Sequence, residues 1–250
     1  MPSRLLLVDA FNLIRRIYEA RKDAMSAVIE ASTQSLDRAL KTIRPTHACV
    51  VFDSHDTTWR HLLYPDYKAN RSPAPEVLLR GVPDFMAAFE RMGVKSVMLP
   101  SYEADDVIAS IAAAISASGN DVTILSTDGL FLQLLSDHVA IVNHFDGHHW
   151  READVVEKYG VRVDQLCDLW AMAGDTSNNI KGVPRIGART AASLLAEYGT
   201  LEEILRTEDD NASANRVRLG GDVAQRCKQL VTQKTDVEVG INLRELRLEV

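Results

Sequence analysis

The densest group of acidic side chains lies in the hexapeptide SYEADD at residues 101–106. Its acids are Glu103, Asp105 and Asp106. Apolar residues at helical spacing follow from Val107 to Ile115, with Ser101 as the expected N-cap, so the acids fall in a first helical turn. The helix dipole favours acids there, which is one interpretation. The other is a hard-cation site, because Mg²⁺ prefers carboxylate oxygens held on rigid backbone.

Single acids follow three other apolar runs that have the character of buried strands. The runs and the acids that follow them are Leu5–Val8 with Asp9, Ala48–Phe52 with Asp53, and Val122–Leu125 with Asp128. The hexapeptide itself follows the run Ser96–Leu99. Continuous apolar runs that alternate with helical stretches predict an α/β fold, with a mainly parallel sheet flanked by helices. Ligands bind such sheets outside the carboxyl ends of the strands, so four segments are predicted to bring acids to one edge.

Carboxylates gathered in this way repel one another unless a cation or a shared proton compensates their charge. No lysine or arginine adjoins these strand ends in the sequence, so we expect no structural ion pairs to neutralise the acids. A divalent metal is therefore expected, and Mg²⁺ or Mn²⁺ is favoured because the ligands are all oxygen atoms.

A segment of different composition separates the second and third of the strand-like runs. Residues 59–75 combine basic side chains with aromatic residues and prolines. This composition is typical of a mobile segment that contacts phosphates and stacks bases. A solvated crossover loop is the alternative that the composition leaves open.

Beyond Asp154 the pattern becomes helical, with no strong strand before the tail, whose leucines are expected to pack on the first domain. Residues 179–190 contain Lys181, Arg185 and Arg189 but no acid. Gly187 precedes a predicted helix whose first backbone amides would be free to bind phosphate. This predicts a sequence-independent contact with the DNA backbone, although an ordinary corner between two helices remains the alternative.

The bulk properties restrict the class of protein further. The chain has 250 residues, 46% of them hydrophobic, and a formal net charge of −7, which excludes a uniformly basic DNA-binding protein. Its three cysteines are far apart and form no metal-binding or disulfide pattern. No stretch is long enough to span a membrane. We therefore expect a cytoplasmic protein. We also expect it to act as a monomer.

Six motifs in order resemble the bacterial 5′-nuclease (flap endonuclease) family. They are LLLVDAFN, VFD, YPDYKANR, SYEADD, LSTDG and AGDTSNNIKGVPRIGARTA. The resemblance extends from Leu5 to about Leu205, and the length is similar to that of the stand-alone Xni type, also called exonuclease IX. It implies a PIN-like catalytic domain at residues 1–158, with an arch at about 55–95, and a helix-three-turn-helix DNA-binding region at 159–250.

The same resemblance implies two-metal hydrolysis of phosphodiesters. The implied metal ligands are Asp9, Asp53, Glu103, Asp105, Asp106, Asp128 and Asp175. Lys68 and Arg71 match the basic residues of the arch and would act with Asp105 in catalysis. The chain departs from the family pattern at Leu130 and Asn178, where two acids are missing. Up to two Mg²⁺ ions are therefore expected, with weak binding of the second.

The implied helix-three-turn-helix would hold one K⁺ ion and contact the DNA. The main-chain carbonyls expected to bind K⁺ belong to Met172, Ala173, Lys181, Val183 and Ile186. The residues expected to face the DNA are Arg185, Ile186, Gly187, Ala188, Arg189 and Thr190. Tyr67, beside the basic residues of the arch, is a candidate stacking platform for a terminal base.

The preferred hypothesis is a Mg²⁺-dependent 5′-flap endonuclease and 5′→3′ exonuclease that cuts DNA near junctions of single and double strands. A second hypothesis is a protein that binds flaps or branched DNA but has weak or lost cleavage because of Leu130 and Asn178. A third is a small metal-dependent ribonuclease, which the helical stretch at 154–205 disfavours.

Overall fold

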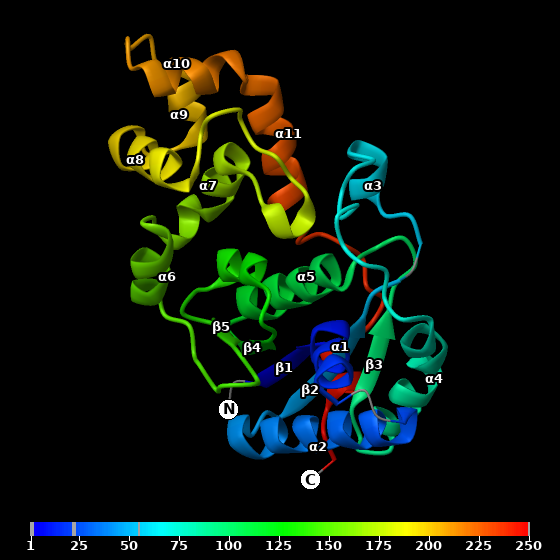
Figure 1. The fold of residues 1–250 in the computed structure, drawn as a ribbon. Coiled ribbons are helices and arrows are strands. Elements are labelled where there is room, and N and C mark those ends of the chain that lie inside the picture. Colours follow the sequence, from blue (N-terminus) through cyan, green and yellow to red (C-terminus); the bar gives the residue numbers. More distant parts are fainter. Residues whose placement is uncertain (1–2, 22–23, 55, 250) are drawn as a thin grey trace.

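A five-stranded parallel sheet forms the centre of the computed structural model, which describes residues 3–21, 24–54 and 56–249 (Figure 1). The strands are β1 (Arg4–Asp9), β2 (His47–Phe52), β3 (Lys95–Met98), β4 (Asp121–Leu125) and β5 (Val139–Val142). Their order is β3-β2-β1-β4-β5, and all neighbours pair in parallel. The predicted fold class is confirmed. Because the strands are parallel, all their carboxyl ends lie at one edge.

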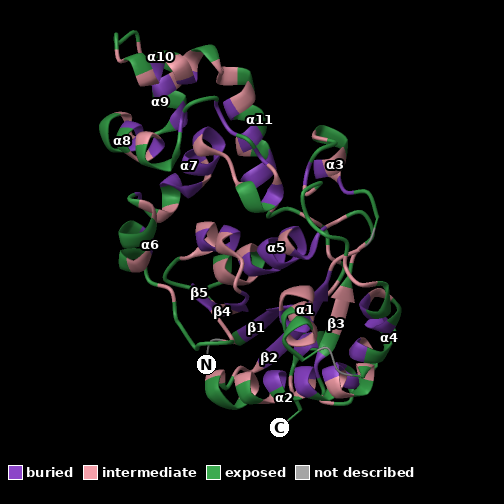
Figure 2. Cartoon of the chain, in the orientation of Figure 1, coloured by how far each residue is buried: buried purple, intermediate pink, exposed green. Residues whose placement is uncertain are grey.

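Both faces of the sheet are covered, which explains why its strands are continuously apolar. Leu6 and Val8 point to the side covered by α1 (Ala10–Arg21), α2 (Met25–Ile43) and α4 (Glu76–Glu90). Leu5 and Leu7 alternate with them and point to the side of α5 (Ala104–Ala117). β1 and β2 are accordingly buried along almost their whole length, whereas the edge strand β3 and the outer surfaces of α2 and α4 are partly exposed (Figure 2).

A helical region lies beyond α5, on the opposite side of the sheet from α2 (Figure 1). Its helices are α6 (Glu152–Tyr159), α7 (Leu166–Ala173), α8 (Ala188–Tyr198), α9 (Leu201–Arg206), α10 (Ala212–Leu219) and α11 (Gly221–Val231). Short 3₁₀ turns are η1 (Gly129–Leu134), η2 (Val163–Gln165), η3 (Thr176–Asn178) and η4 (Leu243–Leu246). The proposed boundary between residues 158 and 159 falls in the last turn of α6, and it stays a prediction.

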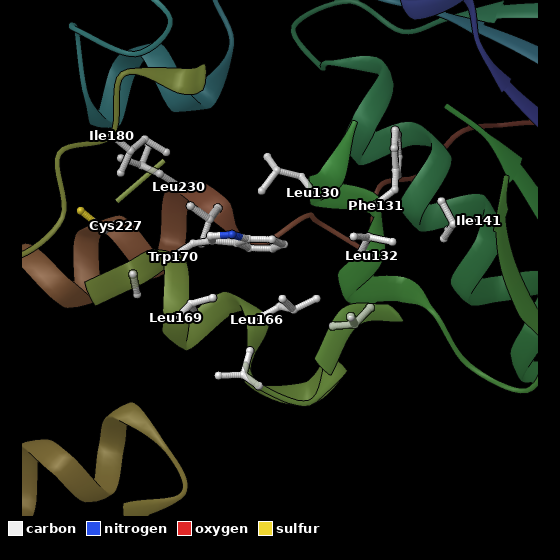
Figure 3. Close-up of a cluster of buried hydrophobic side chains, with 14 of the residues drawn as sticks. Leu130, Phe131, Leu132, Ile141, Leu166, Leu169, Trp170, Ile180, Cys227 and Leu230 are labelled. Atoms are coloured by element: carbon white, nitrogen blue, oxygen red, sulfur yellow. The ribbon is translucent and has the colours of Figure 1, made fainter. Parts of the chain in front are cut away.

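The apolar core of the sheet continues into the helical region without a break. Leu130 and Leu132 of η1 lie toward Leu166 and Trp170 of α7, and Phe131 belongs to the same buried cluster (Figure 3). The same buried cluster contains Leu230 of α11. The two regions are therefore held together by apolar packing as well as by chain connection.

The tail returns to the sheet, as expected from its spaced leucines. Leu246 is buried, and the amide of Leu248 donates to the Thr46 carbonyl at 3.1 Å. Arg247 forms an antiparallel bridge with His47 of β2. Val250, which the leucine pattern included, lies outside the described residues.

The start of α5 differs from the expectation. Ser101 is not the N-cap: it has φ +64°, and Glu103 occupies the N-cap position before Ala104. Only Asp105 and Asp106 lie in the first turn. None of the helices in the described ranges is long and apolar enough to cross a membrane.

Candidate metal and nucleic-acid site

A cavity of about 260 Å³ opens at the carboxyl edge of the sheet and gathers most of the predicted acids. Its charged and amide lining consists of Asp9, Asp53, Asp105, Asp128, Asn12, Arg15, Lys68 and Arg71. The acids come from β1, from the segment after β2, from α5 and from the segment after β4. Four carboxylates from four segments and three cations thus face one small volume.

Hydrogen bonds to neighbouring groups fix the position of three of these carboxylates. Asp9 accepts from the amide of Asn12 at 3.1 Å and from the hydroxyl of Ser126 at 2.9 Å. Asp53 accepts from the first amide of α5 at 2.9 Å. Asp128 caps η1 by accepting from the Leu130 amide at 2.8 Å. The strand ends therefore present carboxylates from rigid backbone.

The pKa values show that cations compensate this charge only in part. Burial, together with the charges of Asp53 and Asp128, raises the pKa of Asp9 to about 7, although hydrogen bonds from Asn12 and Ser126 lower it. Burial also raises the pKa of Asp105, against the opposing effect of Lys68. A bound cation would lower the pKa of both Asp9 and Asp105.

The donor chemistry of the cavity fits a hard divalent cation, because every acidic ligand offers oxygen. The geometry is not assembled, however. Within residues 3–21, 24–54 and 56–249, no group of three or more His, Cys, Asp or Glu side chains is arranged to hold a metal ion.

Two of the predicted metal ligands are neutralised by a buried arginine, so the expectation of no structural ion pair is wrong. Arg60, which is 2% exposed, lies 2.9 Å from Glu103 and 2.7 Å from Asp106. Lys68 lies 2.5 Å from the other oxygen of Glu103. Neither Glu103 nor Asp106 lines the cavity, and their assignment as metal ligands stays a prediction. Arg60 is distant from both acids in sequence, and only tertiary folding brings it to them.

The assignment of Tyr67 as a stacking platform is also wrong. Its side chain is 2% exposed, and its hydroxyl donates to Glu103 at 3.1 Å, so no base can reach the ring. Lys68 and Arg71 do face the cavity. Arg71 additionally donates to the Asn178 side-chain oxygen at 2.8 Å, which ties the segment after α3 (Trp59–Leu63) to the helical region.

Asp175, the remaining predicted ligand, lines a different cavity of about 430 Å³. That cavity also contains Asp128, Leu130 and Lys158. Asp175 accepts from Ser177 and from the Asn178 amide nitrogen. Leu130 packs close to Trp170 in the shared core (Figure 3). An apolar side chain and an amide therefore occupy the places of the two missing acids.

The turn before α8 is closely packed against the end of α7. Gly182 has φ +63°, and a Cβ there would lie 2.6 Å from the Met172 carbonyl oxygen. The carbonyls of Met172 and Val183 each accept one hydrogen bond, which leaves each a second lone pair for an ion. The other three carbonyls predicted for K⁺ belong to Ala173, Lys181 and Ile186.

The residues predicted to face the DNA are mostly accessible. Arg185, Gly187, Ala188 and Arg189 are exposed, and Thr190 is half-buried. The side chain of Ile186 is buried, so only its main chain could meet a ligand. Gly187 is the N-cap of α8, as the sequence predicted.

Two models of the 5′-3′ exonuclease family together match nearly the whole chain. The N-terminal resolvase-like domain matches residues 4–160, and the C-terminal SAM fold matches residues 161–250. The chain belongs to the 5′-3′ exonuclease family.

Similar members of the 5′-3′ exonuclease family include proteins called flap endonuclease Xni. That of Psychromonas ingrahamii is 39% identical, over 99% of this chain and 98% of the relative. That of Pectobacterium carotovorum is 41% identical, over 100% and 96% of the two chains.

Solved structures share the fold. The bacteriophage T5 5′-exonuclease with bound zinc is 25% identical, has a TM-score of 0.76, and aligns over 91% of this chain and 89% of its own. The T5 D15 protein co-crystallised with metal ions is 24% identical, with a TM-score of 0.77 and coverage of 91% and 88%.

Three residues of this 5′-3′ exonuclease were absent from the sequence-based site. Asn12 and Arg15 line the cavity because they share one face of α1, which begins directly after Asp9. Their spacing from Asp9 was a usable signal. Arg60 had no such signal, since its partners lie on a distant helix.

Proposed function

We propose that this chain is a Mg²⁺-dependent, structure-specific nuclease, a 5′-flap endonuclease and 5′→3′ exonuclease that hydrolyses DNA phosphodiesters near junctions of single and double strands. The observation that carries the proposal is the single cavity in which Asp9, Asp53, Asp105 and Asp128 face Lys68 and Arg71. Membership of the 5′-3′ exonuclease family and similarity to flap endonucleases support it.

The four carboxylates would hold Mg²⁺, or Mn²⁺ in its place, at the carboxyl edge of the sheet. When bound, the metal would supply Lewis-acid chemistry, the polarisation of the phosphate and the activation of water. Lys68 and Arg71 would donate to the phosphate oxygens, where negative charge grows during the reaction. Arg71 is held by Asn178, so it approaches the phosphate from a fixed side. The gap at Leu130 and Asn178 would leave a second metal weakly bound.

The helical region would bind the duplex through its backbone. Exposed Arg185 and Arg189 flank the start of α8, and its free amides favour phosphate. One K⁺ ion held by the carbonyls of Met172, Ala173, Lys181, Val183 and Ile186 would reduce the repulsion between an acidic protein and DNA. Such contacts read phosphate positions and not bases, so the substrate is selected by shape.

Cleavage of an end-labelled 5′-flap duplex across a Mg²⁺ titration, with and without K⁺, tests this proposal. We expect cutting near the junction by a monomeric protein. Asp105→Ala should lower the rate by at least about a hundredfold, as expected for loss of charge stabilisation at a metal-dependent site. Asp164→Ala is the matched control, because Asp164 is an exposed acid paired with Arg162. Undiminished cutting by Asp105→Ala would show that this cavity is not the active site.

A second candidate is a protein that binds branched DNA without cutting it efficiently. The observation that favours it is the lack of an assembled metal-binding group among the described residues. The replacement of two acids by Leu130 and Asn178 also favours this candidate. Tight flap binding without product at any concentration of Mg²⁺ or Mn²⁺ would establish this candidate in place of the nuclease.

A further inference from the structure

We propose that an open cavity of about 530 Å³ between α3 and the end of α11 binds one nucleotide of the displaced 5′ single strand. This inference rests on the nuclease function proposed above. The residues that carry it are Trp59, Gln233 and Lys234, which line the cavity together with Lys228 and Thr232.

Gln233 is the first indication of a ligand. Its side chain is 3% exposed, and neither its amide nitrogen nor its oxygen has a hydrogen-bond partner within the described part of the chain. Its backbone amide donates to the Gln133 side-chain oxygen at 3.0 Å, which fixes the residue in place. A buried amide without partners is costly, and a ligand in the cavity could supply the missing partners. Gln233 lines the cavity, but its amide atoms are covered, so the side chain would have to turn toward a ligand; its one acceptor and two donors could then pair with the edge of a base.

Trp59 and Lys234 provide the other two groups that a nucleotide needs. The Lys234 ammonium lies 4.9 Å from the centre of the Trp59 ring, and Trp59 is only half-buried. Stacking on an aromatic ring binds bases with little regard to sequence. A base that enters would replace the ammonium on the ring, and the long lysine side chain could then reach the phosphate of the same nucleotide.

Asp106 holds the walls of this cavity in position. One of its oxygens accepts from the Trp59 indole nitrogen at 2.8 Å, and the other accepts from the backbone amide of Lys234 at 3.0 Å. Arg60 binds the same carboxylate and also donates to the Leu230 carbonyl at the end of α11. The site is therefore built on a rigid, buried ion pair.

The position of the cavity favours a strand of DNA over a free nucleotide. A further cavity of about 420 Å³ shares Asp53, Lys68 and Arg71 with the catalytic cavity. It extends to Thr58 and His61, which adjoin Trp59 at the start of α3. A single strand that leaves the catalytic cavity along this course would arrive beside Trp59.

Tryptophan emission tests binding separately from cleavage. The full chain is titrated in EDTA with thymidine monophosphate, with a thymidine oligonucleotide and with a 5′-flap duplex. We expect a saturable change that disappears in Trp59→Phe, which keeps a stacking ring but removes the reporter. Gln233→Met should weaken oligonucleotide binding about tenfold or more. Because methionine fills a similar volume without an unpaired amide, this variant should melt at or above the wild-type temperature.

Cleavage at two flap lengths completes the test. Gln233→Met should cut flaps of one or two nucleotides at the wild-type rate and show a raised KM for long flaps. Equal oligonucleotide binding by wild type and Gln233→Met would overturn this inference alone, provided that Asp105→Ala still loses cleavage. If the mononucleotide binds and a long flap does not displace it, the inference is also overturned, because the cavity would then bind free nucleotides. If no variant cuts any flap, the proposed nuclease function itself fails.

Discussion

Asp9 and Asp106 are both buried acids close to the same sheet edge, yet their surroundings differ in one decisive respect. Asp106 is paired with Arg60 at 2.7 Å, so burial does not leave its charge uncompensated. Asp9 faces Asp53 and Asp128 and has a pKa raised to about 7. The first arrangement stabilises structure, and the second favours a metal ion or a proton.

We expect the metal-free protein to lose stability as the pH rises from about 4 to about 7. Over that window the unfolded chain, in which Asp9 has a pKa of 3.8, releases a proton that the folded chain retains. Asp9→Asn removes this penalty. In EDTA its free energy of unfolding should therefore exceed that of wild type at pH 8, by a few kcal/mol at most, and the two proteins should be equally stable near pH 4. Thermal melts at both pH values measure this. Added Mg²⁺ should stabilise wild type more than the variant, and equal pH profiles for the two would contradict the prediction.

Arg60→Met should lower the free energy of unfolding by about 3–5 kcal/mol, because it leaves buried Asp106 without its cation. Chemical denaturation measures the difference. Arg162→Met is the control: its pair with Asp164 is mostly exposed at 64% and 66%, so the cost should stay below about 0.5 kcal/mol. Similar losses of unfolding free energy in the two variants would show that the buried pair stabilises the fold no more than the exposed pair.

At the scale of elements, the turn between α7 and α8 determines how the start of α8 faces solvent. Its closest approach is at Gly182, whose backbone lies against Met172 and Gly174. The turn therefore has no room for a side chain at position 182. Its shape depends on backbone contacts with a helix that precedes it in the chain.

Gly182→Ala should weaken binding of a 5′-flap duplex about tenfold or more and leave the metal cavity intact. The added Cβ would lie 2.6 Å from the Met172 carbonyl oxygen, so the turn must shift. Gly240→Ala is the matched control, because Gly240 also has positive φ, at +68°, but nothing within 4 Å of an added Cβ. It should cost only about 1 kcal/mol of backbone strain. Fluorescence anisotropy in EDTA measures binding, and unchanged affinity in Gly182→Ala would separate the turn from DNA recognition.

At the scale of the whole molecule, one apolar core joins the sheet to the helical region, and the missing second-metal acids lie beside it. Leu130 packs near Trp170 within that core (Figure 3). Asn178 is buried between Asp175 and Arg71. Restoring acids at both positions would therefore change the contact between the two regions as well as metal affinity.

The double variant Leu130→Asp with Asn178→Asp should cut flaps faster than wild type, and the gain should be largest at low Mg²⁺, where the wild-type second site would be empty. Without metal it should be less stable by about 2–5 kcal/mol, because a carboxylate is placed in an apolar contact and another beside Asp175. Cleavage rates and melts across a Mg²⁺ titration would show this. A rate that stays at the wild-type value while Mg²⁺ restores stability would mean that the second metal is not limiting.

The sequence by itself determined the parallel α/β fold, the helical second region and the acids at the ends of β1, β2 and β4. These follow from local patterns, since apolar runs define buried strands and parallel strands share one carboxyl edge. It also indicated the start of α8, because glycine ends one segment and opens the next.

Only the tertiary structure decided which of the acids face the cavity and which are neutralised. Arg60 meets Glu103 and Asp106 across more than forty residues of chain, and the same fold buries Tyr67 beneath them. Likewise, Gln233 and Trp59 share a cavity although they lie far apart in the sequence. Charge compensation and burial depend on distances between remote segments, which residue types and spacing along the chain do not contain.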